Sequence, residues 1–448
     1  MSSSWAVFCD EADLAVDLAR LAATTGVGIE PIVEASPLPH AARAAEMGRP
    51  TACAVCALPR EEELVAYALR ARAGTGRAAL AVLESTDDRY WPRAVALDLG
   101  VPAVAEVRPL LALLALLDAG VDASTGLATR GLSRVDQRRL AGCLEPAGRS
   151  GPRLVRDDEG MLALETPRGR YRIGEPRDVL AALEALRAAS PPWATPEARP
   201  SLEPAARRAA HEVLFGPPRR LSDPASKNAL APYGVPLPVE ELVTSPSRAA
   251  SEAARIGFPV RLALASPDLR IWDHPDLAVD GVEGPTRVRE AFRQLHELAA
   301  RHDPTARILG VTVGASMPAR ALLRIGAVPL PEGLVLARIG FADPHGLAAD
   351  DCTDAVLPAA PERIERVLGR LRGHRLLLGP RTEERRETCN ALAGVLGRIA
   401  AFVDEQRPHV EGVEIDPLVL RADGTFEVRE AAVRIGDAFM RALQATGR

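Results

Sequence analysis

The sequence predicts an α/β fold that begins with a flavodoxin-like parallel sheet covered by helices on both faces. Two observations predict it. Short apolar segments of strand character alternate with amphipathic segments of helical period from residue 5 to residue 119, and several helical segments end at a glycine. Five strand–helix pairs in succession are typical of a parallel sheet, because each helix returns the chain to the edge where the next strand begins. The 448 residues exceed one ordinary core, so we expect two or three domains.

The elements follow in order from these runs and from the turn residues between them. The pattern of residues 154–176 predicts short strands joined by the turns "DDEG" and "PRG". Residues 177–189 are expected to form a helix, and the Pro-rich residues 190–204 are expected to form a linker. The chain therefore divides into a flavodoxin-like domain, a small α+β connecting segment with the linker, and a further domain. The predicted boundaries are 1–120, 121–204 and 205–448. In the first domain, strands are expected at 5–8, 29–33, 52–58, 78–84 and 101–106, and helices at 11–26, 39–48, 60–76, 89–100 and 108–120.

Composition excludes several classes of protein. The formal net charge of −5 and the lack of a basic stripe argue against a nucleic-acid-binding protein. No apolar run reaches the length of a membrane span, and the first residues lack the basic region and apolar core of a signal peptide. Six scattered cysteines fit reduced thiols, so we expect a cytoplasmic protein.

The first domain lacks the motifs of two common ligand sites. A phosphoacceptor domain needs an aspartate at the end of the third strand and a lysine after the fifth, and this sequence has neither. No GxGxxG follows the first strand, so a dinucleotide site is unsupported. Cys53 and Cys56 form a lone CxxC among apolar residues, which favours two small buried side chains over redox chemistry or half a metal site.

Lys227 is the one lysine among 55 Lys and Arg residues, and it opens a series of motifs in the C-terminal half. In order and spacing these motifs resemble the ATP-grasp part of the NDP-forming acyl-CoA synthetases, the family that includes succinyl-CoA synthetase. The resemblance implies an ATP-grasp domain, ATP and Mg²⁺ as cofactors, a CoA-binding partner subunit and an oligomer. The motifs are "ASKNALAPYGVPLP" (225–238), "SPSRAASEAARIGFPVRL" (245–262), "ASPDLRIWDHPDLAVDGV" (265–282) and "VEIDPLVLRADGTFEVREAAVRI" (413–435).

The resemblance also implies site residues, and the sequence departs from several of them. Lys227 stands where the first ATP-grasp helix of the family has a lysine, and it becomes a candidate nucleotide ligand together with Arg261 and Arg324. Ala263 occupies the position of the family's phosphate lysine, and Ala321 that of an acidic residue. These candidates have ordinary alternatives, since Lys227 could instead brace its helix, and Arg261 and Arg324 could be solvated strand residues.

A catalytic histidine is the least supported of the family's features in this chain. The histidine segment of the family's ligase domain is absent, and His274 is displaced from the family's "HKSD" by a few residues. His274 is therefore the candidate for phosphoryl transfer, with a surface loop histidine as its alternative.

The spacing around Asp423 predicts a carboxylate pair. Asp416 and Glu430 each lie seven residues from Asp423 in the turn "ADG", so in a hairpin they face each other with Cβ atoms about 5 Å apart. Two like charges so placed repel unless a cation compensates them. A divalent metal is one solution, with Glu414 as a third ligand on the same face, and neutralisation by a neighbouring arginine, Arg429 or Arg434, is the other.

Two functions remain open on this evidence. One is an ATP-grasp subunit of an ADP-forming acid–CoA ligase, with activity reduced or lost in view of Ala263, Ala321 and the incomplete glycine loop. The other is a catalytically inactive homologue that serves as a scaffolding or regulatory protein-binding subunit. In a variant of the first function, the domain binds a different acid and a different phosphoryl donor, with Arg261 and Arg324 in place of the missing lysine.

Overall fold

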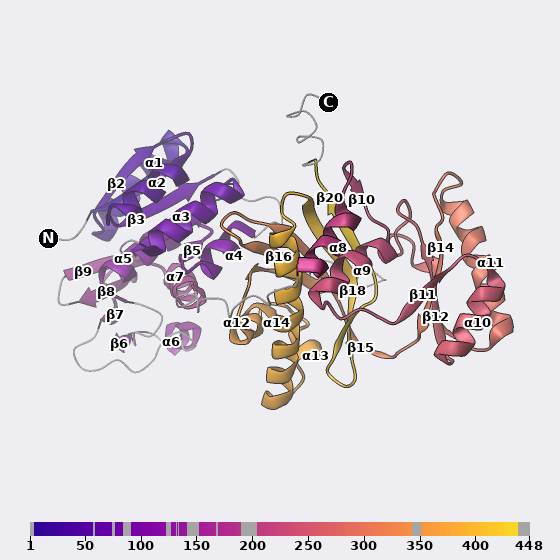
Figure 1. Ribbon diagram of the computed structural model, residues 1–448. Helices are drawn as coiled ribbons and strands as arrows, with labels where there is room; N and C mark the ends of the chain where they lie inside the picture. The colour runs from indigo at the N-terminus through magenta and orange to yellow at the C-terminus, as the bar shows by residue number, and fades with distance from the viewer. Residues whose placement is uncertain are drawn as a thin grey trace, which may run out of the picture. The chain divides into compact units, whose positions relative to one another are not determined.

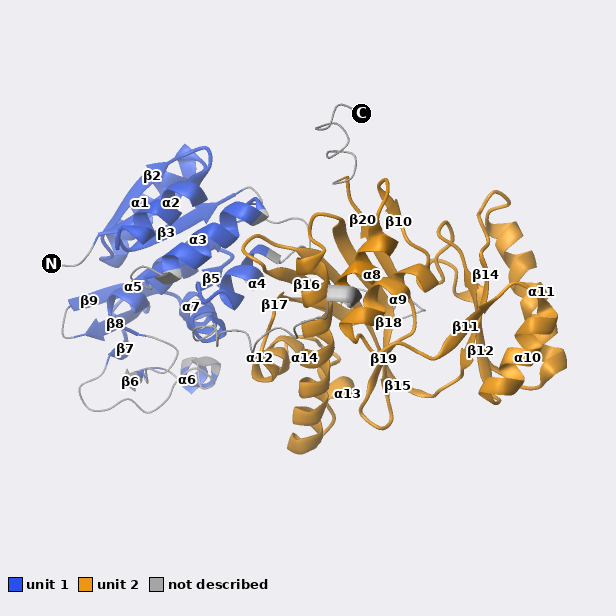
Figure 2. Cartoon of the chain, in the orientation of Figure 1, with its two compact units in different colours: residues 1–194 blue, residues 195–448 orange. Residues whose placement is uncertain are grey.

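The chain divides by contact density into two compact units in this computed structural model. Unit 1 is Met1–Ala194 and unit 2 is Thr195–Arg448 (Figures 1 and 2). The structure describes residues 4–56, 59–73, 77–83, 91–121, 127–130, 132, 134–140, 152–166, 169–189, 204–342 and 351–437. Most of the predicted linker 190–204 lies outside these residues.

Unit 1 contains the predicted parallel sheet. Its strand order is β2-β1-β3-β4-β5 and every pair is parallel, which is the flavodoxin-like order and confirms the predicted fold class. The strands read as continuous buried runs because helices cover both faces. The elements are β1 (Trp5–Cys9), α1 (Ala12–Thr25), β2 (Ile29–Val33), α2 (Pro37–Glu46), β3 (Thr51–Val55), α3 (Glu61–Ala73), β4 (Ala78–Val82), α4 (Trp91–Asp98), β5 (Ala103–Val104) and α5 (Val107–Asp118).

A second, four-stranded sheet follows in unit 1, in the order β6-β7-β8-β9. Leu154, Leu164 and Ile173 from this sheet are buried in the same apolar cluster as Val7 of the first sheet and Leu110 of α5. The connecting segment thus adds to the core of unit 1. Its elements are β6 (Ala128–Arg130), α6 (Arg134–Leu140), β7 (Arg153–Arg156), β8 (Leu162–Thr166), β9 (Gly169–Gly174) and α7 (Pro176–Ala188).

Unit 2 is built around a seven-stranded antiparallel sheet, called here the large sheet. Its order is β10-β20-β18-β15-β16-β17, with β19 paired to β18. The long helix α14 packs on one face over a core that includes Leu323, Ile339, Leu396 and Phe402. The elements are α8 (Pro204–Leu214), β10 (Arg219–Arg220), α9 (Asp223–Leu230), η1 (Ala231–Tyr233), β15 (Ala319–Pro329), β16 (Val335–Phe341), β17 (Cys352–Leu357), α12 (Pro361–Leu368), α13 (His374–Leu378), α14 (Thr382–Glu405), β18 (Val410–Arg421), β19 (Phe426–Val428) and β20 (Ala431–Ile435).

A four-stranded small sheet is inserted in unit 2 between α9 and β15. Its order is β11-β14-β12-β13, and α10 and α11 cover one face with apolar residues such as Ala253, Phe292 and Leu295. The elements are β11 (Glu240–Val243), α10 (Pro246–Ile256), β12 (Val260–Ala265), η2 (Pro275–Leu277), β13 (Ala278–Val282), α11 (Pro285–His302) and β14 (Gly310–Ala315). The polar residues that this insertion turns toward the large sheet form the candidate site.

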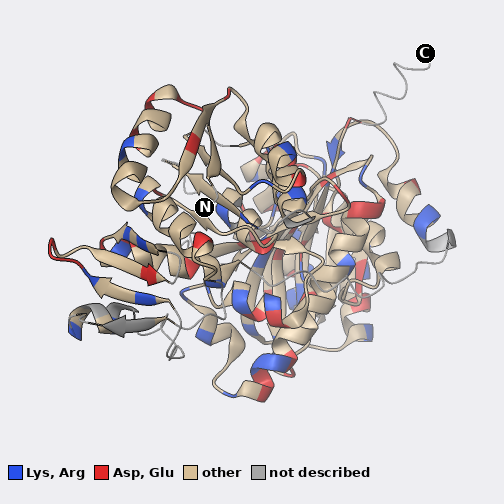
Figure 3. Ribbon diagram, turned by 90° about the vertical axis from the view of Figure 1, so that its left-hand side faces the viewer, with Lys and Arg blue, Asp and Glu red and all other residues tan. Residues whose placement is uncertain are grey.

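Charged residues of both signs are mixed along the same helices and strands (Figure 3). No helix among the described residues is long and apolar enough to cross a membrane.

Candidate functional site

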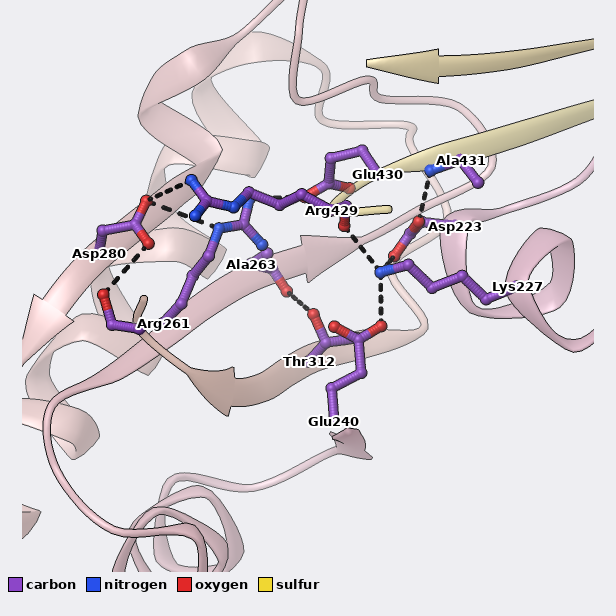
Figure 4. A network of polar contacts seen from close by, with 11 residues as sticks. Asp223, Lys227, Glu240, Arg261, Ala263, Asp280, Thr312, Arg429, Glu430 and Ala431 are labelled. Carbon is purple, nitrogen blue, oxygen red and sulfur yellow. Dashed lines mark hydrogen bonds and ion pairs between the residues drawn. The ribbon is translucent and has the colours of Figure 1, made fainter. Parts of the chain in front are cut away.

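Lys227 lies at the centre of a buried polar network that joins the two sheets of unit 2 (Figure 4). Its ammonium Nζ donates to Asp223 Oδ2 at 2.8 Å, to Glu240 Oε1 at 2.6 Å and to the carbonyl oxygen of Arg429 at 2.8 Å. Asp223 is one turn earlier on α9, Glu240 begins β11 of the small sheet, and Arg429 precedes β20 of the large sheet. An ammonium has three N–H donors, so the protein itself accepts from all three.

Burial and charge act in opposite directions on Lys227. The side chain is only 7% exposed, and burial lowers its pKa, but the carboxylates of Asp223, Glu240 and Glu430 together raise it above its usual value, so Lys227 stays protonated. Asp223 is held in turn by the backbone N–H of Ala431, which donates to Asp223 Oδ1 at 2.7 Å. The lysine and its aspartate therefore fasten α9 to the start of β20.

Arg261 and Glu430 form a second buried pair between the sheets. The Arg261 Nη2 of β12 lies 2.5 Å from Glu430 Oε1, and Asp280 of β13 lies 3.6 Å from Arg261 Nε. Both members are buried, with Glu430 3% and Arg261 9% exposed. Burial and the neighbouring Asp223 raise the pKa of Glu430 above its usual range, while Arg261 and Lys227 oppose that rise.

The predicted register of the hairpin is confirmed. Leu418 pairs with Val428 and Ile415 with Ala431, which places Asp416 opposite Glu430, and the Asp416 N–H donates to the Glu430 carbonyl oxygen at 3.2 Å. Their side chains, however, each reach an arginine.

Asp416 is paired with Arg324 of β15. The Arg324 Nε lies 2.5 Å from Asp416 Oδ2, while the guanidinium remains 52% exposed and the carboxylate 9%. Burial raises the pKa of Asp416, and Arg324 opposes the rise. The two candidate metal carboxylates are thus bound to the two candidate phosphate arginines, as Asp416–Arg324 and Glu430–Arg261.

Glu414, the third candidate metal ligand, lies between two further arginines. Its carboxylate is 3.7 Å from Arg434 Nε and 4.0 Å from Arg270 Nη1. Within the described part of the chain, no group of three or more His, Cys, Asp or Glu side chains is arranged to hold a metal ion.

His274 lies in the loop before η2, outside this network. Its ring packs against that of His302 with centroids 4.2 Å apart, and His302 Nε2 is 2.9 Å from Asp276. Among the described residues, no hydrogen bond or ion pair connects the His274 side chain with Lys227 or Arg261.

The position of the family's phosphate lysine is filled by a small apolar side chain. Ala263 is 1% exposed, and its carbonyl oxygen accepts from Thr312 Oγ1 at 3.3 Å. A cavity lined by the next residue, Leu264, together with Asp223, Glu430 and others has a volume of about 20 Å³, room for about one water.

Sequence reasoning missed Asp223 and Glu240, the two carboxylates that hold Lys227. One signal was available for Asp223, because residues four apart on a helix lie on the same face. Glu240 carried none, since its contact with Lys227 depends on how the small sheet folds back against α9.

Residues 213–435 match the family profile described as "ATP-grasp domain". This segment is an ATP-grasp domain. It is homologous to the beta subunits of ADP-forming acetate–CoA ligases. One relative, the beta subunit of acetate–CoA ligase [ADP-forming] II of Pyrococcus furiosus, is 23% identical over 48% of this chain and 90% of its own length. Another, 4-hydroxybutyrate–CoA ligase [ADP-forming] of Nitrosopumilus maritimus, is 22% identical over 48% of this chain and 30% of its own.

Solved structures give a similar coverage. A Pyrococcus horikoshii protein is 22% identical, with a TM-score of 0.45 over 52% of this chain and 97% of its own. The acetyl-coenzyme A synthetase 1 of Candidatus Korarchaeum cryptofilum, in complex with coenzyme A and Ca-AMPCP, is 23% identical, with a TM-score of 0.43 over 49% of this chain and 94% of its own. The matched family profile lies wholly within unit 2.

Proposed function

We propose that this chain is a divergent homologue of the ATP-grasp subunit of ADP-forming acid–CoA ligases, with reduced or lost thioester-forming activity. In this proposal it acts as a scaffolding or regulatory subunit that binds other proteins. Homology to beta subunits supports a role beside a partner subunit.

The observation that carries the proposal is the bonding of Lys227. A cation that binds ATP phosphates must offer N–H donors to them, and all three donors of Lys227 have acceptors within the protein. Arg261 is likewise neutralised by Glu430. These two side chains therefore support a role in holding the sheets together rather than in binding a nucleotide.

The charge of the network also disfavours Mg-ATP. Four carboxylates, Asp223, Glu240, Asp280 and Glu430, surround three cations, Lys227, Arg261 and Arg429. Phosphates brought to this excess of negative charge would be repelled, and the compensating metal would have to displace an arginine from Asp416 or Glu430. The residues present do not fit the cofactors that the fold implies, so we derive no phosphoryl-transfer step.

Calorimetric titration of the full chain with ATP, with and without Mg²⁺, tests the first half of the proposal. The Pyrococcus furiosus beta subunit, titrated in parallel, is the positive control. We expect no magnesium-dependent heat of binding up to millimolar ATP. Magnesium-dependent binding in the micromolar range would contradict the proposal and favour an active ligase subunit.

The second half is tested by purifying the tagged chain from its native cells and measuring the mass of the complex. We expect a partner in fixed stoichiometry that remains with an Arg255→Gln control, whose exposed arginine pairs with Glu252 on the same helix, α10. A chain that elutes alone and lacks nucleotide binding would refute the scaffold role.

A further inference from the structure

Three arginines and a tryptophan gather at the edge of the large sheet, beside the polar network. Arg220 lies on β10, Arg434 on β20, and Arg270 and Trp272 in the loop after β12. The guanidinium carbons of Arg220 and Arg270 lie 5.0 and 5.4 Å from the centroid of the Trp272 ring. We call these four residues the arginine cluster.

Two of these arginines face each other directly. Arg220 pairs with Arg434 in the antiparallel register of β10 and β20. Side chains in such a pair have Cβ atoms about 5 Å apart, and like charges placed there destabilise the sheet unless an anion lies between them. The Glu414 carboxylate lies 3.7 Å from Arg434 Nε, and the Asp273 carboxylate forms an ion pair with Arg270 Nε.

Arg220 has no such carboxylate. Among the described residues, no hydrogen bond leaves its guanidinium and no carboxylate oxygen lies within 4.0 Å of it, although its five N–H groups are donors. Arg220 is half-buried, and burial together with the neighbouring Arg270 lowers its pKa, while the more distant carboxylates Glu414 and Asp273 oppose that shift. Glu414 and Asp273 are therefore shared by the other two guanidiniums, and Arg220 is the arginine of the cluster that has no ion pair among the described residues.

We infer that the arginine cluster is a metal-independent binding site for a phosphate group. The three guanidiniums come from β10, β20 and a loop: Arg220 and Arg270 line one small cavity with Trp272, and Arg434 lies opposite Arg220 in the strand register. A tetrahedral phosphate can accept from several such forks at once, whereas a planar carboxylate is best matched by a single fork. The Trp272 ring fixes the planes of Arg220 and Arg270 and lowers the entropy lost on binding.

The arginine cluster adjoins the polar network, because Arg220, Arg270 and Trp272 line one small cavity together with Asp223 and Glu430. The proposed site requires neither ATP nor Mg²⁺. A phosphate-containing ligand bound there could regulate the proposed subunit. The inference of the site itself depends only on the contacts of the arginine cluster. Nucleotide binding and phosphate binding are measured separately, so either can fail without the other.

Titration calorimetry of the full chain with inorganic phosphate tests the site, in metal-free buffer at an ionic strength of about 0.05 M, where screening is modest. We expect saturable binding that Arg220→Gln weakens at least tenfold. The control Arg255→Gln removes an arginine that is 62% exposed on α10 and leaves the affinity unchanged. Equal weakening by both variants would overturn the inference, and so would absence of binding of both inorganic phosphate and the phosphate ester described next.

Two further experiments control for misfolding of the variants and distinguish the free phosphate ion from a phosphate ester as the ligand. Arg434 is 46% exposed, so Arg434→Gln is a milder change that must also weaken binding, and each variant is first shown to unfold at the temperature of the unaltered chain. Glycerol 3-phosphate replaces inorganic phosphate in a second titration. Binding of both ligands identifies a site for the free ion, and binding of the ester alone identifies one for a phosphorylated metabolite. Binding of neither overturns the site.

Discussion

Replacing Lys227 by methionine tests whether this lysine holds the fold of unit 2 together. The change keeps the aliphatic stem but removes three charge-assisted hydrogen bonds of 2.6 to 2.8 Å. Asp223 and Glu240, 13% and 14% exposed, would then be buried carboxylates without their cation. Removing one partner of a buried pair costs about 3–5 kcal/mol, and we expect the free energy of unfolding of unit 2 to fall by that amount.

Hydrogen exchange read by mass spectrometry measures this loss locally, from peptides that cover β11 and the β18–β20 hairpin. The double variant Lys227→Met, Glu240→Gln should recover part of the loss, because it removes one of the stranded charges. Arg255→Met, which breaks an exposed ion pair, should cost under about 1 kcal/mol. A loss below about 1 kcal/mol in Lys227→Met would refute the structural role and leave the lysine free for a ligand.

Two further predictions concern acid–base behaviour and backbone geometry. Because the pKa of Glu430 is raised in the folded state, the folded chain binds its proton more tightly, so this group's contribution to stability falls as pH rises above about 4.5. The stability of the unaltered chain minus that of Glu430→Gln should therefore decrease from pH 5 to pH 8 in urea titrations, and a constant or rising difference would contradict this. Gly310 has φ +145° and a Cβ there would lie 2.5 Å from the Val243 carbonyl oxygen, so Gly310→Ala should cost about 3 kcal/mol. Gly281 has φ +70° and open space around it, so Gly281→Ala should lower the free energy of unfolding by only about 1 kcal/mol. Equal losses of stability for the two variants in thermal unfolding would refute the steric argument.

Local patterns in the sequence predicted the strands and helices of the first sheet of unit 1 and the register of one hairpin. The first sheet followed from buried runs such as Thr51–Val55 and Ala78–Val82, whose continuous apolar character fits only a sheet covered on both faces. The opposition of Asp416 and Glu430 followed from counting residues on either side of a turn. Both inferences depend on interactions between near neighbours in the chain.

The partners of those carboxylates could not be predicted in the same way. Arg261 and Glu430 are 169 residues apart, and Arg324 and Asp416 are 92 apart. The sequence suggested nearby Arg429 or Arg434 as the neutralising residue, but the folding of the small sheet against the large one brings more distant arginines to these side chains. The clustering of Arg220, Arg270 and Trp272 depends on the same long-range arrangement.

The burial of the one lysine side chain gives the chain an internal chemical probe of its own conformation. Amine-reactive reagents attack only a neutral, accessible amine, and Lys227 is 7% exposed with its pKa raised by its carboxylates. Acylation of this side chain should therefore require the opening of unit 2. A single mass increment within residues 219–243 would then record how often α9 separates from β11 and β20, with no label introduced into the protein.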